Sequence, residues 1–192
     1  MWRDGIGEGA FDSQARDEIN GIRNALEYRR QPAAIEAAAA TVPSAALTSR
    51  VPLSYVVCQK EIKTKFFTKD LPGYDDGKFA SPVGTTVEGI QGLKHDTFYI
   101  QGRAPPGSTR KPVRYIVVEQ DESLQSLSIP ELTWCLCHDF PNWTGSIKVP
   151  SVTMMAHKLA QLAGVMPNSG GLPDDRADGI NHEAFVNKLH FL

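Results

Sequence analysis

The segment 3–9 places an aspartate where a strand is expected to give way to a helix. Asp4 is followed directly by Gly5, a pair that is typical of a tight turn with the carboxylate exposed at the strand tip. Carboxylates at strand tips commonly hold a divalent metal ion over a phosphodiester. Because Asp–Gly is also a common pair in ordinary turns, the spacing alone leaves a metal ligand and a simple turn residue both open.

The surrounding sequence predicts an α/β fold. A helix over 10–29 is indicated by an apolar stripe at spacings of four, three and four residues, formed by Ala15, Ile19, Ile22 and Leu26. The nearly continuous apolar run 53–59 is typical of a buried strand. Further strand and helix patterns follow at 98–101, 113–118, 130–140 and 151–162. Strands that alternate with helices indicate an α/β domain.

The composition is that of an ordinary globular domain. The chain has 192 residues, of which 41% are hydrophobic and 22% charged, enough to bury a core. Its net charge of −2 does not indicate a nucleic-acid binder, although cations cluster at 60–65 and 103–114, where they can follow a phosphate backbone. Three cysteines suit a reducing compartment, so we expect a cytoplasmic, or else nuclear, protein.

Cys135, Cys137 and His138 raise the alternative of a zinc site. One spacer residue on a helix points the two cysteines apart, and no second pair of ligands follows in the sequence. We therefore expect buried structural cysteines rather than metal ligands.

The N-terminal motif resembles the one that opens the second half of the PIWI domain in Argonaute proteins. Its residues are Trp2-Arg3-Asp4-Gly5, Glu8-Gly9 and Phe11. Further segments between residues 2 and 162 match in the family's order: Val56–Lys60, Thr64–Phe67, Pro82–Val87, Phe98–Ile100, Lys111-Pro112 with Tyr115, Leu136–His138, Val149-Pro150 and Ala156-His157. The chain thus looks like the C-terminal part of a eukaryotic Argonaute-type PIWI domain. This implies an RNase H-like fold that lacks its first strands, with a mixed sheet and flanking helices.

The resemblance implies part of a two-metal RNA-cleaving site. The family's catalytic aspartate falls on Asp4 and its histidine on His157, which makes both residues implied ligands of Mg²⁺ or Mn²⁺. Two further catalytic acids of the family fall before Met1. Because two ligands bind a hard divalent ion poorly, we expect the metal only in the complete site, and no endoribonuclease (slicer) activity from the chain alone.

The resemblance also implies contacts to a small guide RNA that pairs with a target RNA. The implied nucleic-acid-binding residues are Gln59, Lys60, Lys65, Arg103 and Lys111. Arg103 replaces a histidine of the family and Lys111 an arginine. The family's arginine that reaches the guide 5′ phosphate is replaced by Leu162, which removes a bidentate phosphate partner.

We divide the chain into the C-terminal part of a PIWI domain at 1–165, with an Ala-rich insertion at 33–50, a flexible loop at 166–180 and a C-terminal tail at 181–192. The expected function is small-RNA-guided nucleic-acid binding and silencing, together with the remainder of an Argonaute protein and without a membrane. The alternatives are a catalytically inactive nucleic-acid-binding or interaction module, and a gene-model fragment without function.

A shared metal site requires Asp4 and His157 to be neighbours. We expect the helix 151–162 to pack beside the strand tip, with Ala156 in close contact with the sheet and the two side chains within one metal-bridged span of about 5–8 Å, which allows for two metal–ligand bonds and a missing ion. Because the family's preceding strands are missing, we expect the apolar face of the first helix and the edge of the strand 53–59 to be uncovered. The isolated chain should then be poorly soluble.

Overall fold

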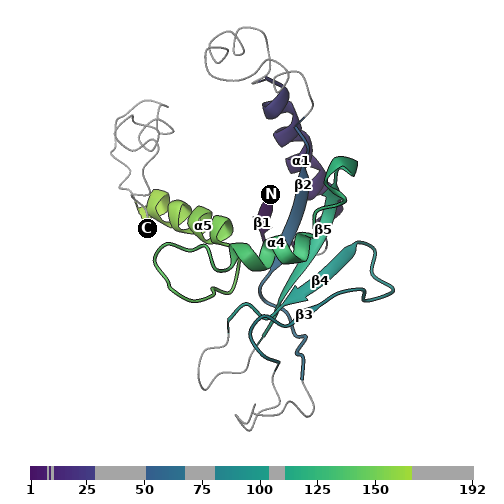
Figure 1. Cartoon of the computed structure of the whole chain (residues 1–192). Coiled ribbons are helices and arrows are strands. Elements are labelled where there is room, and N and C mark those ends of the chain that lie inside the picture. The colour runs from purple at the N-terminus through teal and green to yellow at the C-terminus, as the bar shows by residue number, and fades with distance from the viewer. Residues whose placement is uncertain (8, 10, 29–50, 68–80, 104–110, 166–192) are drawn as a thin grey trace.

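The computed structural model is a five-stranded mixed sheet with helices on both faces (Figure 1). The predicted α/β class is confirmed. The structure describes residues 1–7, 9, 11–28, 51–67, 81–103 and 111–165. The predicted Ala-rich insertion at 33–50, the loop at 166–180 and the tail at 181–192 lie outside the described residues.

The sheet has the strand order β1-β2-β5-β4-β3, with β1 parallel to β2 and the other pairs antiparallel. The strands are β1 (Trp2–Asp4), β2 (Ser54–Gln59), β3 (Thr86–Val87), β4 (Asp96–Ile100) and β5 (Val113–Gln120). Because β2 lies between β1 and β5 and is covered on both faces, it needs a continuous apolar run. The expectation that its edge is uncovered is wrong, since both edges of β2 are paired.

Helix α1 (Phe11–Tyr28) covers one face of the sheet. Ala15 and Ile19 of its apolar stripe are buried in one cluster with side chains of β2 and β5, namely Tyr55, Val57 and Ile116. The expectation that this helix face is uncovered is wrong. The strands of the chain itself supply the apolar surface on which the stripe packs.

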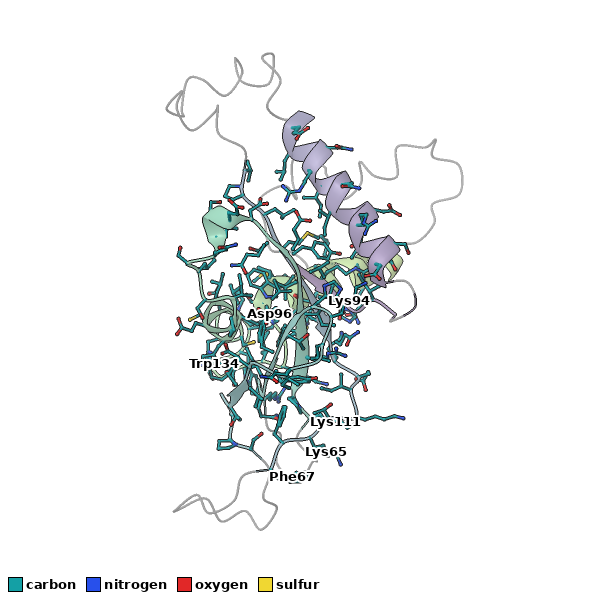
Figure 2. All side chains as sticks on the ribbon, turned by 90° about the vertical axis from the view of Figure 1, so that its right-hand side faces the viewer. Lys65, Phe67, Lys94, Asp96, Lys111 and Trp134 are labelled. Atoms are coloured by element: carbon teal, nitrogen blue, oxygen red, sulfur yellow. The ribbon has the colours of Figure 1, made fainter. Side chains whose placement is uncertain are left out.

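The opposite face of the sheet is covered by α4 (Ile129–Leu136) and by the start of α5 (Ser151–Val165). Figure 2 shows Trp134 of α4 on the side of the sheet away from α1. The buried cluster on this face consists of Val56, Cys58, Phe98, Ile100, Val113, Tyr115, Ile129 and Val149. Successive side chains of a strand point to opposite faces of the sheet, so alternate residues of β2 belong to the two clusters.

Helix α4 ends four residues earlier than predicted, at Leu136. Its inward face is formed by Ile129 and Thr133, while Cys135 is exposed and Cys137 is buried at the helix end. The expectation that both cysteines are buried is therefore wrong for Cys135. Side chains two positions apart on a helix point about 200° apart around its axis. Because Thr133 faces the core, Cys135 faces solvent.

Only the first turns of α5 pack on the sheet. Ser151 and Thr153 are buried and Met154 packs against the core, whereas Ala156 is exposed. The remainder of α5 extends away from the sheet (Figure 1). The prediction that Ala156 makes the close contact with the sheet is wrong, because Ala156 faces solvent and the contact with β1 is made by its neighbour His157. Among the described helices, none has the combination of length and apolar composition that crossing a bilayer requires.

Candidate nucleic-acid interface

Asp4 lies at the carboxyl end of β1, where the chain turns away from the sheet. Gly5 has a φ of 43°, a conformation that favours glycine. Its N–H donates to the carbonyl of Cys58 at 2.9 Å, so the ladder between β1 and β2 extends one residue past Asp4. This turn presents the Asp4 side chain, which is 33% exposed, at the tip of the strand.

Neighbouring residues of β1 point to opposite faces of the sheet. Arg3 faces α1, where its guanidinium pairs with Glu18 at 3.0 Å, and Glu18 also accepts a hydrogen bond from the Tyr55 hydroxyl at 2.5 Å. The hydrogen bond from Arg3 lowers the pKa of Glu18, and burial raises the pKa of Tyr55. This network ties β1 to α1 and β2 and so positions the strand that carries Asp4.

Asp4 contacts a lysine and a histidine on the α5 side of the sheet. Its Oδ2 lies 2.7 Å from Nζ of Lys60 and 3.9 Å from Nδ1 of His157. The structure therefore brings Asp4 and His157 together from distant parts of the sequence. Their contact is shorter than the expected span of about 5–8 Å, and Lys60 and His157 approach the same carboxylate oxygen.

The described residues do not form a complete metal site by themselves. Within the described part of the chain, no three histidine, cysteine or acidic side chains gather into a metal-binding group. Asp4 and His157 supply two donors, and the Lys60 ammonium already neutralises one carboxylate oxygen. Mg²⁺ is usually held by one or two carboxylates together with substrate phosphates, and this pair supplies a single carboxylate.

A groove of about 730 Å³ opens at the carboxyl ends of β1 and β2. We call it the Asp4 groove, and it is lined by Asp4, Gly5, Ile6, Gly7, Gln59, Lys60, Glu61, Ile62, Lys63, Thr64, Tyr99 and Arg114. Lys60, Lys63 and Arg114 are its cations, and Asp4 and Glu61 are its anions. The lining therefore carries a small excess of positive charge although the whole chain is negative.

Gln59 and Lys60 enter the Asp4 groove from opposite faces of the sheet. Gln59 donates to the Ile6 carbonyl at 3.4 Å and accepts from Arg114 at 3.4 Å, whereas Lys60 pairs with Asp4. Both side chains reach the groove because β2 ends at Gln59. The predicted Gln–Lys pair thus lies beside the predicted metal ligands.

The other three predicted nucleic-acid-binding residues do not line the Asp4 groove. Lys65 and Lys111 are exposed and lie toward the lower end of the molecule in Figure 2, away from α1. Arg103 lies over the ring of Trp143, with its Cζ 4.9 Å from the ring centroid. The structure therefore gathers only part of the predicted set around Asp4.

Lys63 and Arg114 belong to the basic clusters 60–65 and 103–114 but were not among the predicted binding residues, and Trp143 had no predicted role. Lys63 belongs to the same basic run as Lys60, which is a usable signal. Arg114 lies between two buried apolar residues of β5, and this alternation predicts that it points to the other face. Trp143 lies outside every periodic segment, so nothing in the sequence indicated its position.

Comparison with known proteins shows what the chain is similar to. A family model for the Piwi domain matches residues 1–167. "Piwi-like protein Ago3" of Bombyx mori is 30% identical over 196 residues, which cover 100% of this chain and 18% of that protein. The crystal structure of Drosophila Piwi matches with a TM-score of 0.63 and 27% identity over 85% of this chain and 20% of that chain. A Kluyveromyces polysporus Argonaute with a guide RNA matches with a TM-score of 0.61 and 21% identity over 84% and 18%.

These structural matches confirm the predicted RNase H-like PIWI fold. The chain spans 18% of the Bombyx mori relative and 20% of the Drosophila structure. The family model covers most of the chain and begins at its first residue, in agreement with the resemblance that the N-terminal motif carries. The chain therefore belongs to the Piwi domain family.

Proposed function

We propose that this domain binds the backbone of a guide or target RNA in the Asp4 groove and acts in small-RNA-guided silencing with the remainder of an Argonaute protein. The observation that carries the proposal is the gathering of Lys60, Lys63 and Arg114 around an open groove at the strand ends. Membership in the Piwi family supports the same class of ligand. We also propose a cytoplasmic or nuclear protein, because three cysteines suit a reducing compartment better than a disulfide framework.

The three cations suit a phosphate backbone in different ways. Arg114 offers a planar fork for phosphate oxygens, while Lys63 is exposed at the mouth of the groove. Lys60 is held at 2.7 Å by Asp4, so a phosphate must compete with that carboxylate for its ammonium. We infer that the exposed Lys63 makes the first contact and that Lys60 and Arg114, which donates to Gln59, join it.

The salt dependence of RNA binding tests this function. Replacing both Lys60 and Lys63 by alanine should weaken binding to every single-stranded RNA and reduce the slope of log K against log salt by about 1.4, since each phosphate contact contributes about 0.7. Arg16→Ala, which removes an exposed cation of α1 outside the groove, is the matched control and should leave the slope unchanged. An unchanged slope in the double variant would contradict the proposal.

The contact between Asp4 and His157 at 3.9 Å favours a second function, a contribution to RNA cleavage. We propose that these residues are two of the ligands of Mg²⁺ or Mn²⁺ in the complete site, where other parts of the protein or RNA phosphates supply the remaining oxygens. A bound metal would supply charge stabilisation at the phosphate. Within this chain, Lys60 holds the Asp4 carboxylate at the strand tip and the contact with His157 keeps the imidazole beside it.

Substitutions of the two ligands separate cleavage from binding. Asp4→Asn and His157→Ala should each abolish cleavage by the intact protein and weaken Mn²⁺ binding measured by electron paramagnetic resonance, while RNA affinity is retained. Asp12→Asn, which breaks an exposed ion pair with Lys94, is the matched control. Full cleavage activity of the Asp4→Asn protein would contradict the proposed role of Asp4 as a metal ligand. RNA binding would then be the remaining proposed function of the domain.

A further inference from the structure

Trp143 is a large aromatic side chain that the fold leaves half uncovered. Its exposure is 49%, and the guanidinium of Arg103 lies 4.9 Å from its ring centroid. This separation is within the roughly 6 Å at which a cation and an aromatic face attract each other. Neither residue lines the Asp4 groove, and the contact joins the end of β4 to the segment between α4 and α5.

Two glycines allow this contact to form. A Cβ at Gly102 would lie 2.7 Å from the Ile147 carbonyl oxygen and 2.9 Å from that of Lys148, so the backbone before Arg103 packs directly on the backbone after Trp143. A Cβ at Gly145 would lie 3.1 Å from the indole Nε1 of Trp143. The Trp143–Arg103 pair therefore rests on two backbone segments that are packed against each other.

The same segment reaches the Asp4 groove. Lys148 follows Ile147 and donates from its Nζ to the carbonyl of Lys60 at 3.3 Å, and it lies 3.9 Å from Glu61. One connected stretch of protein thus joins the Trp143–Arg103 pair to the cations that we propose to hold RNA phosphates.

We propose that the Trp143–Arg103 pair is a stacking site for a nucleobase of single-stranded nucleic acid, an inference that rests on the proposed function. Aromatic rings and guanidinium planes both stack on bases, and every base has a suitable face, so the site reads no particular sequence. The charge of Arg103 favours a polyanion over an apolar protein segment. A strand in the Asp4 groove can place its phosphates on the lysines and a base on this pair.

Trp143→Ala and Trp143→Phe test the stacking role in the intact protein. With a single-stranded RNA oligonucleotide, Trp143→Ala should weaken binding by about 5- to 150-fold, the range expected for one stacked base, and Trp143→Phe should recover part of the loss. An oligonucleotide of the same length with abasic sugars should bind wild type and Trp143→Ala equally. The salt slope should be the same in all three proteins, because no phosphate contact is removed.

Three results would overturn the inference in different ways. Equal RNA affinity of Trp143→Ala and wild type would exclude the stacking role. The exposed indole would then be interpreted as a contact site for a protein partner. An equal loss of affinity for the abasic oligonucleotide would show that the substitution disturbs the backbone-binding surface rather than a base contact. Absence of RNA binding by wild type would overturn both the inference and the proposed function, whereas the first two results leave the proposed function intact.

Discussion

Gly102 lies at a crossing of two backbone segments that has no room for a side chain. A Cβ built there would be 2.7 Å from the Ile147 carbonyl oxygen, 2.9 Å from the Lys148 carbonyl oxygen and 3.2 Å from the Lys148 carbonyl carbon. All three are backbone atoms, so they cannot rotate away as the end of a flexible side chain can. Gly102→Ala must therefore push two segments of the fold apart.

The magnitude follows from two opposing effects. Inserting a methyl group into a closely packed site costs about 1–3 kcal/mol, while replacing glycine by alanine stabilises by about 0.4–1 kcal/mol through the unfolded chain. A Cβ at 2.7 Å from a backbone atom calls for the upper half of the first range, so we expect a net loss of about 1–2.6 kcal/mol in the free energy of unfolding. For a domain of this size, this corresponds to a decrease in melting temperature of about 2–10 °C.

Gly21→Ala is the matched control, because it makes the same chemical change in an open place. Gly21 lies within α1, and a Cβ there would meet no atom within 4 Å beyond its chain neighbours and the backbone of its own helix. Glycine inside a helix is less stable than alanine by about 0.5–1 kcal/mol, so this variant should melt at a higher temperature than wild type. Thermal unfolding followed by circular dichroism gives both values.

Opposite signs for the two variants are the expected result. A Gly102→Ala protein as stable as wild type would refute the close backbone approach at this position. It would also remove the support that this approach gives to the Trp143–Arg103 pair.

Thiol chemistry and pH give two further tests. Burial raises the pKa of Cys58 to about 12 and that of Cys137 to about 11, whereas Cys135 is exposed. A thiol reagent at neutral pH should therefore modify Cys135 alone, and Cys135→Ser should remove this rapid labelling. Rapid labelling of a second thiol would contradict the burial of Cys58 and Cys137. The hydrogen bond from Arg3 holds the pKa of Glu18 below the ordinary value of 4.5, so its stabilisation is present above pH 4.5 and is lost as the pH falls through the lowered value. The loss of melting temperature on acidification should therefore be smaller in Glu18→Gln than in wild type, and an identical loss in both would exclude this contribution.

Local patterns in the sequence were sufficient to predict several elements of the fold. The apolar stripe through Ala15 and Ile19 predicted helix α1, the run 53–59 predicted the buried strand β2, and the Asp4–Gly5 pair predicted the turn after β1. Each of these depends on a period or a backbone preference that a few neighbouring residues express. The resemblance to Argonaute proteins, carried by short motifs in order, then indicated the fold family that the comparisons confirm.

Which side chains contact one another depends on the folded arrangement of the whole domain. In the structure, Lys60 pairs with the Asp4 carboxylate, and Gln59 lies on the other face of the sheet, where it contacts Arg114. Arg103 lies outside the Asp4 groove, over the ring of Trp143. These contacts depend on strand register and on the approach of segments far apart in the chain. A periodic pattern in a few neighbouring residues contains no information about either. The same reason explains why the expected uncovered face of α1 is covered: the partner surface of a helix lies elsewhere in the sequence, and only folding brings it there.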